Sequence, residues 1–188
     1  MTRMNKNISP VDPWAMQRTL MEASGQRLPS TPELNNGVVL YAALSLEEGA
    51  EILQGLVRVL RRLSQTPREP LARRFDVLAN HLQEAQTQMH EHSLAIRAEL
   101  ADIESFRREL LSDEVVEMAD GTTDLTVTNA GFALSLGLDG AACYHEVAGS
   151  NLSKRNPDTG RIDKTPDGKW VKGREYREPD LRSVIWPK

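Results

Sequence analysis

The segment from Leu71 to Met89 reads LARRFDVLANHLQEAQTQM, and its apolar side chains recur every three or four residues. These side chains, at spacings of 4, 3, 4, 3 and 4, belong to Leu71, Phe75, Leu78, Leu82, Ala85 and Met89. Such a spacing predicts a helix that packs along a second helix. An unbroken helix over residues 69–110 would be about 60 Å long. We therefore expect two helices here, or an arm that leaves the core.

Capping residues and helix breakers divide the rest of the chain. They predict four further helices, over about residues 13–23, 38–63, 112–136 and 139–154. The first three are expected to be capped by Asp12, by Asn35 or Asn36, and by Ser112, and Gly137 is expected to end the third. Turn signals at residues 156–160 and 165–168 predict an irregular or β-hairpin tail. We expect an all-α core over residues 1–155, with an insertion at about 67–110. An extension over residues 156–188 would pack on the core or on a neighbouring subunit.

Composition and charge exclude several classes of protein. The 188 residues include 23 Lys and Arg against 27 Asp and Glu, which gives a net charge of −4. An acidic chain is poorly suited to coating nucleic acid, because phosphate neutralisation dominates that affinity. The single cysteine, Cys143, excludes a disulfide scaffold. No apolar run approaches the roughly 20 residues that span a membrane, and no signal peptide is recognisable, so we expect a soluble cytoplasmic protein with no nucleic-acid or membrane partner.

Two expected helices carry acidic side chains at helical spacing. Glu47, Glu48 and Glu51 project from one side of the first, and Glu117, Asp120 and Asp124 repeat the pattern on the second. The helix turns apolar after Asp124, which predicts that Asp124 begins a buried segment. Two such stripes can surround a hard divalent cation with carboxylate oxygens. The alternative is that each stripe is a solvated helix face, since acidic residues are mostly exposed.

These motifs, taken in order, resemble the all-α nucleoside triphosphate pyrophosphohydrolases of the MazG and HisE group, which includes dimeric dUTPase-like enzymes. The family pattern is Glu-Glu-x-x-Glu followed by Glu-x-x-Asp on a later helix. The flanking segments agree, and they read RLPSTP at 27–32, HEVAGSNLSK at 145–154, and DGKWVKG at 167–173 with Tyr176 and PDL at 179–181. The tail and length are similar to those of phage MazG-like members, including the MazZ group, which acts on dGTP and GTP.

The resemblance implies a MazG-like helical bundle that hydrolyses a nucleoside triphosphate to the monophosphate and pyrophosphate. The implied Mg²⁺ ligands, with Mn²⁺ as a substitute and two or more ions per site, are Glu47, Glu48, Glu51, Glu117, Asp120 and Asp124. All of these except Glu117 are also implied catalytic residues. The implied substrate-binding residues are Asn151, Lys154, Lys172, Arg174 and Tyr176. The resemblance also implies a homo-oligomer, a dimer or tetramer, in the cytoplasm of a host cell if a phage encodes the chain.

The chain departs from the family pattern at three places. Gly121 stands where the glutamate partner of Asp124 belongs, so either Asp120 or Glu117 must supply that ligand, and we favour Asp120. The insertion is longer than usual. Ala148 stands where some relatives carry histidine. We rank dGTP and GTP first as substrates, with dUTP or a broad dNTP range as the alternative and a non-enzymatic helical interaction protein as the rival reading.

Overall fold

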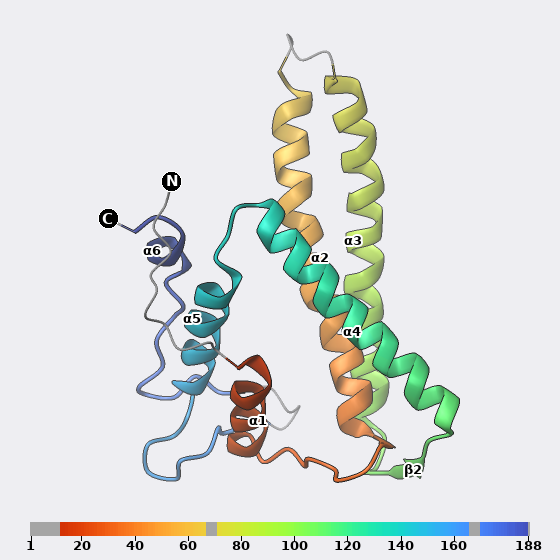
Figure 1. Ribbon diagram of the computed structural model, residues 1–188, viewed down its shortest axis with the longest axis vertical. Helices are drawn as coiled ribbons and strands as arrows, with labels where there is room; N and C mark the ends of the chain where they lie inside the picture. The colour runs from red at the N-terminus through yellow and green to blue at the C-terminus, as the bar shows by residue number, and fades with distance from the viewer. Residues whose placement is uncertain (1–11, 67–70, 166–169, 188) are drawn as a thin grey trace. The chain divides into compact units, whose positions relative to one another are not determined.

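The computed structural model describes residues 12–66, 71–165 and 170–187. These residues form six helices and one two-stranded sheet, so the predicted all-α class is confirmed (Figure 1). In chain order the elements are α1 (Pro13–Ala23), β1 (Glu33–Asn35), α2 (Asn36–Ser64), α3 (Ala72–Ala101), β2 (Arg107–Glu109), α4 (Ser112–Ser135), α5 (Gly140–Leu152) and α6 (Leu181–Ile185). None of the helices in the described ranges is long and apolar enough to cross a membrane.

The chain forms two compact units. The hairpin unit is Glu33–Glu109, and the terminal unit combines Met1–Pro32 with Leu110–Lys188. The sequence analysis placed a boundary at residue 155, whereas the structure keeps residues 110–188 in one unit and joins α2 to the insertion. The reason is packing, because α2 lies along α3 and the chain after residue 155 packs on α1 and α5.

The hairpin unit consists mainly of two long antiparallel helices, α2 and α3, which lie side by side (Figure 1). Most of their buried residues are small, namely Ala43 and Ala50 of α2 and Ala79 and Ser93 of α3, and the larger Val57 and Leu60 of α2 are buried as well. Gly49 lies against Met89, since a Cβ at position 49 would stand 2.5 Å from the Met89 Cε atom. Small residues let the two backbones approach closely, so methionine can fill the space that glycine leaves.

The predicted helix-packing seam was only partly right. Phe75, Leu82 and Met89 are half-buried, but Leu71 and Leu78 are about half exposed, at 46% and 50%. The buried positions are Ala79 and Ser93, which a search for large apolar residues does not select. α3 is one helix of 30 residues, and it ends at Ala101 rather than continuing toward residue 110.

A short sheet closes the open end of the hairpin. β1 and β2 pair antiparallel, with Leu34 opposite Arg108. The Asn35 side chain accepts hydrogen bonds from the amides of Gly37 and Val38 at 2.8 and 3.3 Å, which begins α2 where the sequence predicted. The sequence analysis missed the sheet, because strands of three residues carry no readable alternation.

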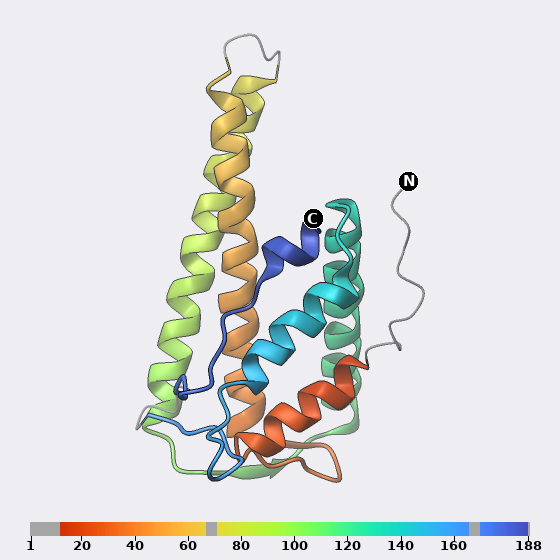
Figure 2. The same ribbon diagram turned by 90° about the vertical axis from the view of Figure 1, so that its left-hand side faces the viewer.

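The terminal unit has its core where α1 meets the chain after α5. Leu20, Ala23 and Ile162 are buried together, with Leu152 and Trp170 packed against them. α1 lies beside α5, as Figure 2 shows. Beyond Arg155 the described residues form isolated bridges, Arg155 with Ile162 and Lys164 with Trp170, and no strand. The irregular alternative for the tail therefore holds there, while residues 166–168 of the second predicted turn lie outside the described residues.

α4 differs from its prediction in two respects. Its N-cap is Leu111 rather than Ser112, because the Glu114 carboxylate accepts the Leu111 amide at 2.8 Å. The predicted buried segment after Asp124 is wrong, since Leu125, Val127 and Leu134 are 48%, 63% and 73% exposed. α4 contains no buried residue. Within its unit it packs on α5, and its other apolar side chains face solvent.

Candidate functional site

The acidic cluster of α2 lies in the hairpin unit. Glu47, Glu48 and Glu51 follow one another within two helical turns, and Arg97 of α3 donates a hydrogen bond to Glu47 Oε2 at 2.9 Å. Both side chains of this ion pair are about 30% exposed. Among the described residues, neither Glu48 nor Glu51 has an ion-pair partner. The sequence analysis missed Arg97, because a partner 50 residues away on another helix leaves no local pattern.

The carboxyl group of Glu48 is affected by burial and by the negative charges of its neighbours. Its pKa is raised above the ordinary value of 4.5 by partial burial, then by repulsion from Glu51 and Glu47. A bound divalent cation would offset that repulsion, and its preferred ligands are carboxylate oxygens. Glu48 and Glu51 therefore fit a Mg²⁺ or Mn²⁺ ion chemically, whereas Glu47 is already paired with Arg97.

The acidic residues of α4 belong to the terminal unit. Glu117, Asp120 and Asp124 are all exposed along this helix. Over residues 12–66, 71–165 and 170–187, the structure holds no group of three or more His, Cys, Asp or Glu side chains placed to bind a metal ion. The predicted role of both acidic groups in binding metal, and the choice between Asp120 and Glu117, stay predictions.

Four of the five predicted substrate-binding residues come together in the terminal unit. Asn151 and Lys154 lie at the end of α5, where the Lys154 Nζ atom donates to Asn151 Oδ1 at 2.8 Å. The tail brings Tyr176 to the same place, with its ring centre 6.0 Å from Lys154 Nζ and 4.6 Å from Lys172 Nζ. We call Asn151, Lys154, Lys172 and Tyr176 the amine–aromatic group.

The amine–aromatic group is electrostatically suited to an anion. Burial lowers the pKa of Lys154, an effect that Tyr176 partly offsets and that the positive charge of Lys172 increases. Lys172 has one carboxylate nearby, the exposed Glu178 at 3.7 Å. Two ammonium groups on one ring repel each other, and a phosphate between them would relieve that repulsion.

Trp170 borders the amine–aromatic group, whereas Arg174 lies apart from it. The Lys154 Nζ atom lies 5.5 Å from the centre of the Trp170 ring, so Trp170 borders the amine–aromatic group as well as the core. Arg174 points elsewhere and pairs with Asp158 at 3.0 Å, with both side chains mostly exposed. Ala148, where some relatives carry histidine, is buried at 3% exposure.

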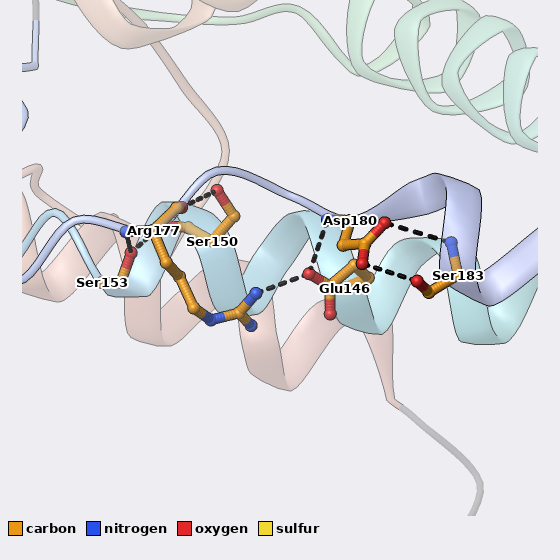
Figure 3. A network of polar contacts seen from close by, with 6 residues as sticks. All are labelled: Glu146, Ser150, Ser153, Arg177, Asp180 and Ser183. Atoms are coloured by element: carbon orange, nitrogen blue, oxygen red, sulfur yellow. Dashed lines mark hydrogen bonds and ion pairs between the residues drawn. The ribbon is translucent and has the colours of Figure 1, made fainter.

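A polar network fastens the tail to α5 (Figure 3). Glu146 of α5 accepts hydrogen bonds from the Arg177 guanidinium and, at 2.9 Å, from the Asp180 amide. Ser150 donates to the Arg177 carbonyl at 2.8 Å, and the Arg177 amide donates to Ser153 Oγ at 3.0 Å. The Asp180 amide and then Arg177 lower the pKa of Glu146, because both contacts favour the charged carboxylate.

The end of the tail is organised by Asp180. Its carboxylate accepts the Ser183 amide at 3.1 Å and the Ser183 hydroxyl at 2.6 Å, which caps the short helix α6. α6 was not predicted, although Asp180 is of a residue type that is favoured at helix N-caps.

Comparison with protein-family models, with curated proteins and with solved structures finds no match to this chain. The likeness to the all-α pyrophosphohydrolases therefore rests on sequence motifs. The geometry of the amine–aromatic group and of the α2 acidic cluster rests on the contacts described above.

Proposed function

We propose that this protein hydrolyses a nucleoside triphosphate to the monophosphate and pyrophosphate in a reaction that needs Mg²⁺. Water attacks the α-phosphorus, the bond to the bridging oxygen of the β-phosphate breaks, and pyrophosphate leaves with that electron pair. The observation that carries the proposal is the amine–aromatic group. Two residues implied for substrate binding at the end of α5, Asn151 and Lys154, lie 18 to 25 positions before two in the tail, Lys172 and Tyr176, yet all four share one place in the terminal unit.

In this proposal the two amines bind the triphosphate. Lys154, partly buried and hydrogen-bonded to Asn151, supplies one amine, and Lys172 supplies a second on the Tyr176 ring. Burial lowers the pKa of Lys154, and a bound phosphate would favour its charged form. A charge-assisted hydrogen bond from an ammonium to a phosphate oxygen is stronger than a neutral one. Tyr176 offers a ring face on which the sugar or base can rest.

In this proposal, acidic side chains bind the metal ion. Mg²⁺ would neutralise the triphosphate and lower the pKa of the attacking water. Glu48 and Glu51 of α2 would be metal ligands in the hairpin unit. The resemblance also implies Glu117, Asp120 and Asp124 of α4 as metal ligands, in the terminal unit. Glu47 would take part only after exchanging its partner Arg97. Guanine nucleotides remain first among the proposed substrates, ahead of dUTP or a broad dNTP range.

The test is product analysis with a panel of dNTPs and NTPs, with Mg²⁺, with Mn²⁺ and with chelator. We expect monophosphate and pyrophosphate in equal amounts, with metal only. Lys154→Met and Glu48→Gln should each lower kcat/KM by 100-fold or more, and Glu84→Gln on the exposed face of α3 should not change it. A folded, metal-loaded protein that turns over no nucleotide would refute the proposal.

A second candidate, the helical interaction protein, is favoured by the exposed apolar side chains of α4. Leu125, Val127 and Leu134 stand open to solvent on a helix without buried residues. A second copy of the chain is the partner that the predicted dimer or tetramer requires. Light scattering should then give a mass that is a multiple of the chain mass. Leu134→Ser should lower this measured mass. Oligomerisation without hydrolysis would favour this candidate over the enzyme.

A further inference from the structure

Arg177 is bound to α5 and to its C-cap residue Ser153 through both its side chain and its backbone. Its guanidinium pairs with Glu146, its amide donates to Ser153, and its carbonyl accepts from Ser150 (Figure 3). Both its backbone and its side chain are therefore held by one helix. Ser150 is buried at 3% exposure and the Glu146 side chain is 19% exposed, whereas the Arg177 side chain is 50% exposed. Water therefore competes less for the Ser150 contact than for the Glu146–Arg177 ion pair.

α5 leaves space for this arginine at Gly149. A Cβ built on Gly149 would lie 2.7 Å from the Arg177 Nη2 atom, well inside van der Waals contact. Glycine is otherwise a poor residue for the interior of a helix. Its presence two residues before Asn151 is explained by the guanidinium that passes over it.

Arg177 directly follows Tyr176, whose ring faces Lys154 and Lys172. Neighbouring Cα atoms are about 3.8 Å apart, so fixing the Arg177 backbone on α5 fixes where Tyr176 can reach. The Arg174–Asp158 pair, which is exposed, gives the tail a weaker tie on the other side of Tyr176.

We propose that Glu146 and Arg177 form a clasp whose role is to position Tyr176 and Lys172 beside Lys154. Arg177 is thus a positioning residue for the amine–aromatic group and touches no substrate. The inference rests on the proposed function for the nature of the ligand, a triphosphate, but the clasp itself exists in the protein without nucleotide.

The first test is amide hydrogen exchange in the nucleotide-free full chain. The amides of Arg177 and Asp180 report directly, because they donate to Ser153 and Glu146. We expect Arg177→Gln to speed their exchange at least tenfold and Arg177→Lys to restore at least half of the protection on a logarithmic scale. Arg161→Gln, the same change at an exposed position of the tail, should leave both amides unchanged. Unchanged exchange in Arg177→Gln would overturn the clasp.

The second test separates positioning from folding. Arg177→Gln should raise KM for dGTP about tenfold and change kcat less than twofold, as expected when uniform binding is lost. Gly149→Ala should raise KM about threefold without lowering the melting temperature, because alanine favours the helix while displacing the guanidinium. Gly131→Ala in α4, where nothing lies within 4 Å of the added Cβ, is the matched control for KM.

The outcomes for the two proposals are distinguishable. Faster exchange with an unchanged KM would show a tail fastening that positions nothing, and would overturn the inference while leaving the hydrolase intact. If the wild-type protein hydrolyses no nucleotide, the proposed function fails, and binding of inorganic triphosphate replaces KM as the measurement. An Arg177→Gln variant that then binds triphosphate as tightly as wild type, or a wild type that binds none, would overturn the inference.

Discussion

The hydroxyl of Ser93 is fully buried between α2 and α3, at 0% exposure of the residue, and has no hydrogen-bond partner among the described residues. An unsatisfied buried polar group costs about 1–3 kcal/mol. Ser93→Ala removes that group and improves helix propensity. We expect it to raise the free energy of unfolding by about 1 kcal/mol, measured by urea denaturation.

The control for Ser93 is Ser45 in α2. Its hydroxyl donates to the Tyr41 carbonyl at 2.9 Å, and the residue is exposed. Ser45→Ala should change the unfolding free energy by less than about 0.5 kcal/mol. A loss of stability in Ser93→Ala would mean that the hydroxyl is paired in solution.

Glu48, a predicted metal ligand, destabilises the folded chain when its carboxyl group is charged. Its pKa in the folded chain is raised, so the folded state prefers the protonated carboxyl and the charged form destabilises it. This penalty is absent below the ordinary pKa of about 4.5 and develops as the pH rises through the raised value. At pH 7, in chelator, we expect Glu48→Gln to be more stable than wild type.

The measurement is urea denaturation of Glu48→Gln and wild type at pH 4 and pH 7. The difference in stability between them should be larger at pH 7 than at pH 4. Glu84→Gln, an exposed change on α3, should show no such trend. A Glu48→Gln variant that is less stable at pH 7 would indicate that the carboxylate has a favourable partner, and it would remove the argument for a cation there.

At the scale of the element, two glycines of α2 test how the hairpin packs. Gly55 has nothing within 4 Å of an added Cβ, whereas Gly49 has the Met89 Cε atom at 2.5 Å. Gly55→Ala should raise the unfolding free energy by about 0.5–1 kcal/mol through helix propensity. Gly49→Leu should lower it by about 1–3 kcal/mol through overpacking. Thermal or urea denaturation of both variants measures this, and equal effects would contradict the observed seam.

Local chemistry made several helix ends predictable, although not the start of α4, and left helix partners unpredictable. Asp12, Asn35 and Asp139 all cap helices as their types suggest, and Gly137 ends α4 with a positive φ of 74°. These effects act over a few residues. The seam of α3 is set instead by which residues α2 presents, so small buried residues such as Ala79 replaced the expected Leu78.

At the scale of the whole molecule, the candidate site also contains residues that the sequence predicts and residues that it does not. Spacing along one helix correctly placed Glu47, Glu48 and Glu51 on neighbouring turns, and motif likeness selected Asn151, Lys154, Lys172 and Tyr176, which the structure brings together. Neither source could find Arg97, Glu146 or Arg177 as partners. Each belongs to a contact over more than 30 residues of chain, where sequence carries no period to read.

If one reaction uses both groups, metal and nucleotide must bind cooperatively in the full chain. The α2 acidic cluster lies in the hairpin unit and the amine–aromatic group in the terminal unit. Linkage requires that each ligand raise the affinity for the other by the same factor. We expect Mg²⁺ to tighten dGTP binding at least tenfold relative to chelator, measured by calorimetry.

The variants show whether that coupling belongs to this chain or to the nucleotide alone. Mg²⁺ binds free triphosphates in solution, so a gain that survives Glu48→Gln would come from the nucleotide–metal complex and not from α2. We expect Glu48→Gln to abolish the gain while keeping affinity in chelator, because the Lys154 amine is untouched. Lys154→Met should weaken binding under both conditions. Only this pair of opposite patterns is compatible with one reaction that uses both groups. A gain that survives Glu48→Gln would leave the amine–aromatic group as a binding site without the proposed chemistry, and a Lys154→Met variant that binds as tightly as wild type would show that this group does not bind the nucleotide.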